Sequence, residues 1–331
     1  MVVTVVGAGV VGLSIADLLL AAGFQVRILY DRGPLETTSA KASAIWHVYL
    51  VDPNDERILR WSERTLRKLV ELAREEPESG VFMVKGVELF RGAEIGPPAW
   101  AGVPPVFRML DRREIAVADA RWGYEIRAPF AIMPEYLAWL TGRVSARGCE
   151  FVEEHVEDVW ALAIAEGIVV NAAGLGARDL VSDRTLLGVK GQYLVIAWPD
   201  GVGEEYVGFD ECPGGMAYVM PRKSDIVIGG TEEYGVEDEA FVLDEGELIG
   251  RCASLAPWLS TTSVLVLDRV AGVRPYRPDG VRLDALSVGE SGCLINCYGH
   301  GGSGFSLSWG CAADVLELVR GEEHKRLANG G

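Results

Sequence analysis

The stretch that decides the fold is residues 2–12, Val-Val-Thr-Val-Val-Gly-Ala-Gly-Val-Val-Gly. Residues 2–6 are a β-branched run typical of a buried strand, and a helical apolar stretch from 11 to 22 follows. A second apolar run, residues 26–30, comes next. A strand, a glycine loop, a helix and a second strand open a parallel sheet, so the sequence predicts an α/β fold with a Rossmann-type domain.

The three glycines of this loop each have a role in binding a dinucleotide. Gly7 permits a tight turn, Gly9 lets the backbone approach a pyrophosphate, and Gly12 allows close packing of helix and strand. The start of the helix then offers free N–H groups to the phosphates. Asp31 closes the second strand, where an acid can bind a ribose hydroxyl. The motif fits FAD and NAD alike, while Asp31 disfavours the 2′-phosphate of NADP.

A second glycine loop lies near the end of the chain. Residues 296–304, Asn-Cys-Tyr-Gly-His-Gly-Gly-Ser-Gly, follow an apolar run and open a helix expected from Phe305 to Arg320, with a stop at Gly321. A second helix start suits the far end of the same cofactor. It favours a flavin, because the positive helix end stabilises negative charge on the reduced ring.

Hydrolase and metal chemistry are disfavoured. A serine nucleophile elbow needs glycine two positions after the serine, but Phe305 follows Ser303 at that spacing. His300 is therefore expected to be structural. We expect no metal, because the histidines lack ligand spacing; they are His47, His155, His300 and His324.

The middle of the chain has more antiparallel signals than the ends. Strands are expected at 192–197 and 217–221, with a hairpin loop at 222–225 returning into 226–230. Helices are expected to start at Asn54, to end before Pro77, and to start again at Pro134. We predict an FAD-binding domain from residues 1–45, 141–190 and 285–321, an α+β substrate-binding domain with a mixed or antiparallel sheet from 46–140 and 191–284, and a C-terminal tail from 322–331.

Composition sets further expectations. The chain has 331 residues, a net charge of −17 and six cysteines without a Cys-x-x-Cys pair. A nucleic-acid partner and an anionic membrane surface are disfavoured because both favour a basic footprint. We expect a cytoplasmic protein with thiol cysteines, and a homo-oligomer is an open possibility.

Four segments of the sequence are similar to those of a known family. Residues 296–312, NCYGHGGSGFSLSWGCA, resemble the C-terminal signature of the D-amino-acid oxidase family. Residues 272–278, GVRPYRP, followed by 281–283, VRL, resemble its arginine-bearing segment. Residues 170–175, VNAAGL, and the segment from Asp31 to Leu50 resemble its flavin-contacting parts. The resemblance covers nearly the whole chain and is greater to D-amino-acid oxidases than to D-aspartate oxidases.

This resemblance implies noncovalent FAD and oxidative deamination of D-amino acids. A hydride passes from Cα to flavin N5, oxygen becomes hydrogen peroxide, and the products are a 2-oxo acid and ammonia. Arg274 and Tyr218 match the residues that bind the substrate carboxylate, and Gly302 matches the carbonyl that takes the amine. A fixed carboxylate and amine leave hydride transfer with no need for a catalytic acid or base. From residue type alone, Arg274 could instead form a structural ion pair and Tyr218 could pack a sheet face.

The motifs and the resemblance together predict the cofactor site. The expected FAD-contacting residues are Gly7, Ala8, Gly9, Val10, Val11, Gly12, Asp31, Arg32, Thr37, Thr38, Ser39, Ala44, Ile45, Val156, Ala173, Gly174, Arg282, Gly299, Gly301, Gly302, Ser303, Gly304, Phe305 and Ser306.

The chain also departs from the family pattern. Gly214 replaces a lid tyrosine, and Ser303 stands where a bulky aromatic residue is common. Glu232 follows Gly-Gly-Thr where D-aspartate oxidases carry an arginine, so repulsion of a second carboxylate favours neutral or basic D-amino acids. The alternatives are a glycine- or sarcosine-type amine oxidase or dehydrogenase, a D-aspartate oxidase, and a noncatalytic dinucleotide-binding module.

Overall fold

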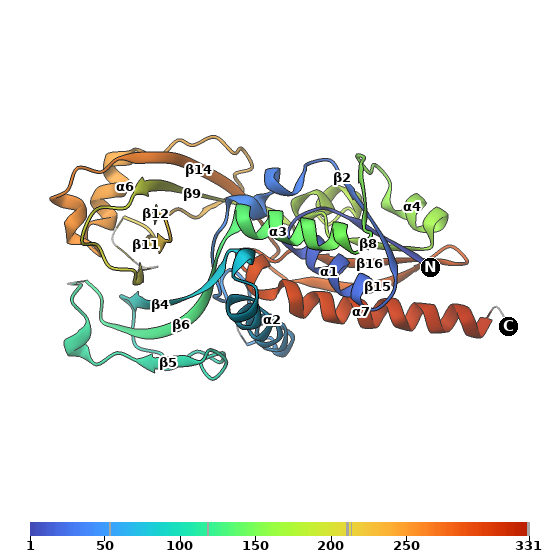
Figure 1. Cartoon of the computed structure of the whole chain (residues 1–331), viewed down its shortest axis with the longest axis horizontal. Helices are drawn as coiled ribbons and strands as arrows, with labels where there is room; N and C mark the ends of the chain where they lie inside the picture. Colours follow the sequence, from blue (N-terminus) through green and yellow to red (C-terminus); the bar gives the residue numbers. More distant parts are fainter. Residues whose placement is uncertain (53, 118, 210–211, 213, 330–331) are drawn as a thin grey trace.

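The molecule is elongated, with one sheet in each half (Figure 1). The structure is a computed structural model and describes residues 1–52, 54–117, 119–209, 212 and 214–329. It confirms the expected mixed α/β class, because a largely parallel sheet with helices and a mixed sheet are both present.

The first sheet is the Rossmann-type one. Its strand order is β15-β16-β8-β1-β2-β7, and every pair is parallel except the β15–β16 edge. Its strands are β1 (Val2–Val6), β2 (Gln25–Tyr30), β7 (Glu150–Glu153), β8 (Ile168–Asn171), β15 (Arg282–Val288) and β16 (Gly292–Tyr298). The chain order reverses between β1 and β8, and ligands of such sheets bind outside the carboxyl ends of the strands at this point.

The helices pack on the two sheets and on one another. Helix α1 (Val10–Ala21) packs on α3 (Met133–Ala146) and on α7 (Gly304–Asn329), and α2 (Glu56–Glu75) packs on α7. The buried carboxylate of Asp17 on α1 ties α3 in place, with Arg143 at 3.0 Å and Arg147 at 2.7 Å. The other α-helices are α4 (Val159–Glu166), α5 (Ala177–Leu180) and α6 (Glu245–Cys252). The short 3₁₀ segments are Pro34–Glu36, Thr38–Lys41, Pro77–Ser79, Arg112–Glu114, Gly174–Gly176 and Pro257–Ser260.

The second sheet has the order β13-β9-β12-β11-β10-β4-β6-β3, with β14 also paired to β9 and β5 to β6. Its strands are β3 (Ser43–Ile45), β4 (Val81–Phe90), β5 (Val106–Met109), β6 (Trp122–Ile132), β9 (Leu187–Ala197), β10 (Tyr206–Phe209), β11 (Ala217–Arg222), β12 (Asp225–Gly229), β13 (Glu233–Tyr234) and β14 (Val266–Tyr276). The sheet is mixed because β10 runs parallel to β4. The predicted hairpin is confirmed, since Arg222 pairs with Asp225.

Two predicted helix ends are wrong. The α2 helix is capped by Asp55 rather than Asn54, because the Asp55 carboxylate accepts the Arg57 N–H at 2.8 Å. Helix α7 does not stop at Gly321 but continues to Asn329, so residues 322–329 are helix rather than tail.

The helix tolerates Gly321, although glycine costs about 1 kcal/mol relative to alanine. Two contacts support the extra turns: Lys325 pairs with Glu322 at 2.5 Å, and Arg326 donates to the Ser291 carbonyl at 2.6 Å. The last residues of the predicted tail, Gly330 and Gly331, lie outside the described residues.

The chain passes between the sheets close to the predicted domain boundaries. Strand β3 already belongs to the second sheet, β9 begins at Leu187 and β15 begins at Arg282. The boundary predicted at 140 falls within α3, and the division into two domains at 45, 140, 190 and 284 itself stays a prediction.

Candidate active site

A cavity of about 630 Å³ runs from the carboxyl ends of β1, β2 and β8 to the face of the second sheet. This volume lies within the usual range for cofactor and ligand sites. Most predicted cofactor residues line it: Gly7, Ala8, Gly9, Val10, Val11, Asp31, Arg32, Thr37, Thr38, Ser39, Ala44, Ile45, Val156, Ala173, Gly174, Gly301, Gly302, Gly304 and Phe305.

The first glycine loop forms a cradle that only glycine can build. Gly7 has a φ of +110°, and a Cβ there would lie 2.5 Å from the Ala172 carbonyl oxygen. A Cβ on Gly12 would lie 2.0 Å from the Gly7 carbonyl oxygen. Gly9 starts α1 without a side-chain cap, and the first turn carries no acidic residue. Backbone N–H groups and the positive end of α1 are therefore left to hold an anion, which fits the pyrophosphate of a dinucleotide.

The second glycine loop packs on the segment that follows β3. A Cβ on Gly301 would lie 2.4 Å from the Leu50 carbonyl oxygen, and one on Gly302 would lie 2.2 Å from Cδ1 of Tyr49. Ser303 Oγ accepts from the Tyr49 N–H at 2.7 Å and donates to the Tyr49 carbonyl at 2.6 Å. The start of α7 and the Tyr49 ring are thus held together at the cavity wall.

Five predicted cofactor residues lie outside the lining: Gly12, Arg282, Gly299, Ser303 and Ser306. Their observed contacts hold the wall in shape. Ser306 Oγ accepts from the His47 N–H at 3.0 Å, and Arg282 donates to the Tyr298 hydroxyl at 2.9 Å. Direct contact between these five residues and the cofactor stays a prediction.

Arg274 reaches into the other end of the cavity. A Cβ on Gly191 would lie 2.3 Å from the Arg274 guanidinium, so the glycine leaves the space that this side chain fills. Arg274 donates to the Thr231 carbonyl at 3.3 Å, and its guanidinium carbon lies 5.7 Å from the centre of the Tyr49 ring. Within the part of the chain that the structure describes, no carboxylate forms an ion pair with Arg274. The structural ion pair that residue type alone allowed is therefore not seen there.

Tyr218 lines the same end of the cavity. Its phenol ring lies against Gly229 and Gly230, where a Cβ would come within 2.4 Å and 2.6 Å of ring atoms. Burial raises the pKa of Tyr218 to about 12, while the nearby Arg274 acts in the opposite direction. The phenol therefore stays a neutral hydrogen-bond donor at neutral pH.

Several lining residues were missed by sequence reasoning: His47, Glu88, Tyr193, Tyr206, Met216 and Met220. Burial lowers the pKa of His47 to about 4, and its Nε2 lies 3.1 Å from the Tyr124 hydroxyl. No sequence motif marks these residues, because they come together only through strand pairing.

Glu232 is held at the edge of this region. Its carboxylate accepts from the hydroxyls of Tyr49 and Tyr234. It is absent from the cavity lining, so its predicted repulsion of a second carboxylate would act from behind Tyr49.

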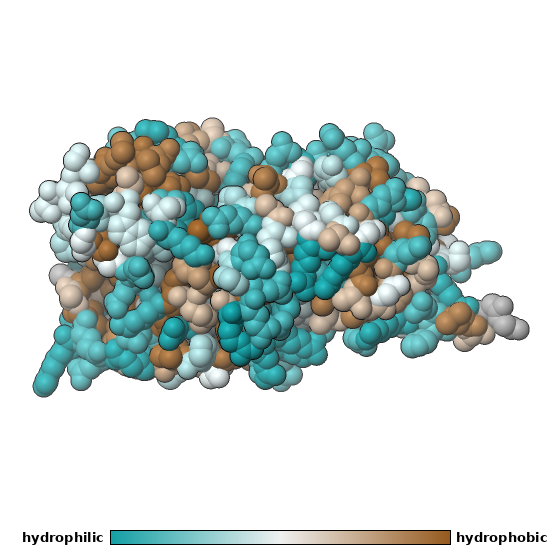
Figure 2. All heavy atoms as spheres, viewed as in Figure 1, coloured by the Kyte–Doolittle hydropathy of each residue, from teal (hydrophilic) through white to brown (hydrophobic). Residues whose placement is uncertain are grey.

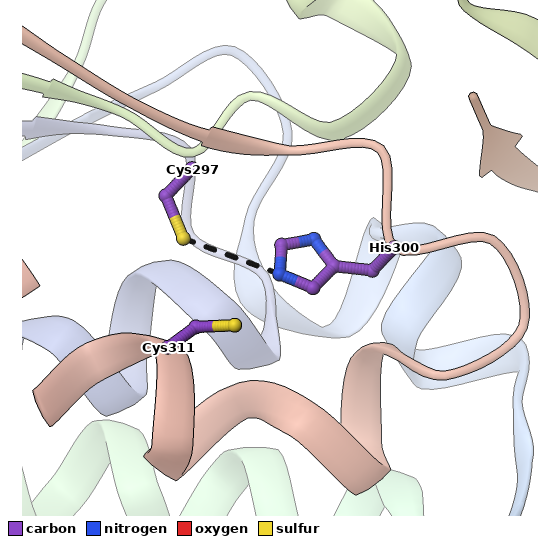
Figure 3. Close-up of side chains that lie close together, drawn as sticks. All are labelled: Cys297, His300 and Cys311. Carbon is purple, nitrogen blue, oxygen red and sulfur yellow. Dashed lines mark hydrogen bonds between the residues drawn. The ribbon is translucent and has the colours of Figure 1, made fainter. Parts of the chain in front are cut away.

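Two thiols and an imidazole meet beneath the second glycine loop. Figure 3 shows Cys297 from β16, His300 from the loop and Cys311 from α7 pointing toward one another, with their ligand atoms within 4.8 Å. A hydrogen bond with Cys311 lowers the pKa of Cys297, and burial raises that of Cys311. Histidine spacing in the sequence does not reveal this donor set, since two of its three members are cysteines. That no metal binds stays a prediction.

Comparison with known proteins gives one consistent family. Residues 3–318 match the family model described as FAD dependent oxidoreductase. A D-amino-acid oxidase from Rubrobacter xylanophilus is 39% identical, over 95% of this chain and 94% of that protein. The human D-aspartate oxidase is 32% identical, over 96% of this chain and 94% of that protein.

The fold has solved counterparts. A glycine oxidase from Geobacillus kaustophilus superposes with a TM-score of 0.77 at 20% identity, over 96% of this chain and 94% of that chain. Across the described residues, no helix combines the length and the apolar character needed to cross a membrane.

Proposed function

Because the chain belongs to the family of FAD-dependent oxidoreductases that includes the D-amino-acid oxidases, we propose that it oxidises neutral and basic D-amino acids. FAD is its cofactor, and the reaction is oxidative deamination to a 2-oxo acid, ammonia and hydrogen peroxide. When bound, FAD accepts the two electrons from the substrate and passes them to oxygen. We propose that FAD is held noncovalently by the glycine cradle at the start of α1.

The observation that carries the substrate assignment is Arg274, a cation in the cavity with no ion pair among the described residues. A guanidinium binds a carboxylate through two parallel, charge-assisted hydrogen bonds. The Tyr218 hydroxyl is a neutral donor at the same end and would donate a third. Together they fix the carboxylate of an amino acid.

The remaining groups on the substrate are assigned by proposal. The Gly302 carbonyl would accept from the α-ammonium group, which leaves one stereoisomer with its Cα–H toward the cofactor. No side chain needs to remove this hydrogen as a proton, because it leaves with the electron pair. We therefore assign no catalytic role to His47, although it lines the cavity. Its low pKa and its contact with Tyr124 describe a neutral, structural imidazole.

Flavin absorbance under nitrogen tests the proposed function. The purified protein should be yellow, and D-alanine should bleach it while L-alanine should not. A colourless protein that takes up no flavin would refute the cofactor site. A yellow protein that glycine or sarcosine bleaches faster than D-alanine would favour the amine-oxidase alternative.

We expect D-aspartate to be a far poorer substrate than D-alanine, because Glu232 places a negative charge behind Tyr49. Replacement Glu232→Arg should narrow the ratio of kcat/KM for the two substrates by about tenfold or more, since it reverses one charge near the cavity. Glu205→Arg is the matched control, because Glu205 pairs with Lys85 away from the cavity. An unchanged ratio in Glu232→Arg would show that Glu232 does not select substrates.

Location and assembly are further proposals. We propose a cytoplasmic protein, supported by the free thiols of all six cysteines. We also propose a homo-oligomer, supported by the exposed side chains of Val242, Leu265 and Leu267. Figure 2 shows a hydrophobic patch at the upper left of its face, in the half of the molecule that holds α6 and β14.

A further inference from the structure

One row of paired residues crosses the second sheet beneath the cavity. Glu88 pairs with Gly208, Gly208 with Tyr218, Tyr218 with Gly229, and Gly229 with Tyr193. Residues paired directly across strands place their side chains on the same face. Glu88, Tyr218 and Tyr193 all line the cavity, so this face is the inner one.

The glycines in this row leave space for larger side chains to lean over them. A Cβ on Gly208 would lie 2.5 Å from Oε2 of Glu88 and 2.1 Å from the hydroxyl of Tyr206. The Glu88 carboxylate therefore lies above β10, one strand away from Tyr218. Glu88 is 3% exposed.

The surroundings of Glu88 suit a cation on a long apolar stem. The Tyr206 hydroxyl donates to the Glu88 carboxylate, which can accept further hydrogen bonds at the same time. Tyr206, Met216 and Met220 line the cavity within one buried cluster and offer aromatic and thioether surface. Aromatic faces attract cations, and the apolar surface packs against methylene groups.

The spacing from Arg274 to Glu88 matches one extended substrate. The Arg274 guanidinium lies over Gly191 on β9, and β9, β12, β11 and β10 are successive neighbours in the sheet. Three strand spacings amount to about 14 Å, and Gly191 lies two residues, or about 7 Å, along β9 from Tyr193, where the row ends, so the separation is about 16 Å. An amino acid as long as lysine or arginine measures about 7 Å from its carboxylate to its cationic group. An ion pair of up to about 4 Å at each end brings this reach to about 15 Å.

We propose that Glu88 forms a subsite for the ammonium or guanidinium group on the side chain of a basic D-amino acid. This inference rests on the proposed function, because it places the substrate carboxylate at Arg274. It makes Glu88 the residue that favours basic over neutral side chains.

Kinetics with paired substrates test the proposal. In the wild type, kcat/KM should be higher for D-arginine than for D-norleucine. Glu88→Gln should lower the D-arginine to D-norleucine ratio at least tenfold while D-norleucine changes little. Glu205→Gln removes an exposed carboxylate that pairs with Lys85 and does not line the cavity, so it should leave the ratio unchanged. An unchanged ratio in Glu88→Gln overturns the proposal. If D-norleucine and D-alanine also fail to reduce the flavin, the proposed function itself fails.

A binding measurement needs neither turnover nor a variant. The ligand 5-guanidinopentanoate is D-arginine without its α-amino group. Hexanoate is a carboxylate whose chain carries no cation. Perturbation of the flavin spectrum in the wild-type holoenzyme should give a Kd at least tenfold lower for 5-guanidinopentanoate than for hexanoate. Equal binding, or tighter binding of hexanoate, contradicts the subsite even if Glu88→Gln fails to fold.

Discussion

The two ends of the cavity are built from different parts of the polypeptide. The cofactor end is made of backbone: Gly7, Gly9 and the start of α1 lie within a few residues of one another. The substrate end is made of side chains from strands far apart in the sequence, such as Glu88, Tyr218 and Arg274. A backbone site is therefore encoded locally, whereas a side-chain site depends on sheet register.

This difference predicts how the two ends respond to mutation. A new side chain in the backbone cradle should remove the cofactor, while truncation at the other end should spare the cofactor and change only the reaction with substrate.

The largest effect is expected at Gly9. Gly9→Val should yield protein that purifies without FAD, because a branched side chain would fill the space beside Ser39 where the pyrophosphate approaches. The ratio of flavin to protein absorbance measures this loss. Gly142→Val on α3 is the control, since a Cβ there meets nothing within 4 Å. Full flavin in Gly9→Val would show that this loop does not hold the cofactor.

A smaller effect is expected at Tyr218. Tyr218→Phe should keep FAD and lose about ten- to a hundredfold in the rate of flavin reduction at low D-alanine concentration. One hydrogen bond to a charged group is worth about 1.5–3 kcal/mol, and each tenfold in rate corresponds to about 1.4 kcal/mol. Because the pKa of Tyr218 is about 12, its contribution should not change between pH 7 and 10.

The control for this variant is Tyr136, another buried phenol, which does not line the cavity. Its hydroxyl accepts a hydrogen bond from Trp309 Nε1 at 2.8 Å. Tyr136→Phe should leave the rate of flavin reduction unchanged. A wild-type rate in Tyr218→Phe would mean that this hydroxyl does not touch the substrate.

How much the sequence predicts follows the same division. Gly7, Gly12 and the first strands could be predicted because each depends on neighbours in the chain. Glu88 and Tyr193 could not, because the row that joins them requires the pairing of five strands, including the parallel β4–β10 pair. Arg274 and Tyr218 were predicted only from the family resemblance, because the strand register that brings them together is not readable from this sequence.

Helix ends and the thiol cluster were missed for local reasons. Gly321 is a frequent helix terminator, but contacts of Lys325 and Arg326 beyond it continue α7. Cys297, His300 and Cys311 come from a strand, a loop and a helix, so no regular spacing connects them.

The smallest effect concerns His47, which lines the cavity. Its folded-state pKa of about 4 is below the value of about 6.5 expected when unfolded. Between these values the unfolded chain binds more protons, so acidification from pH 6.5 to 4 should lower the free energy of unfolding. The loss from this one group should be on the order of 3 kcal/mol.

Urea unfolding of the holoenzyme at several pH values measures this loss. His47→Gln should show a weaker pH dependence over this range than the wild type, whereas the exposed His324→Gln should not. Identical pH dependence in His47→Gln and the wild type would show that folding does not lower the pKa of His47.

The central claim is that Arg274 holds the substrate carboxylate, and anaerobic stopped-flow reduction by D-alanine tests it most directly. Arg274→Ala should fold and bind FAD normally, yet lose at least about a hundredfold in flavin reduction per unit of D-alanine, because two charge-assisted hydrogen bonds are removed. Arg274→Lys should recover only part of the rate, since an ammonium group does not form the two parallel hydrogen bonds that a guanidinium forms with a carboxylate. An Arg274→Ala variant that stays yellow and is reduced at the wild-type rate would contradict the account and assign the carboxylate to another residue.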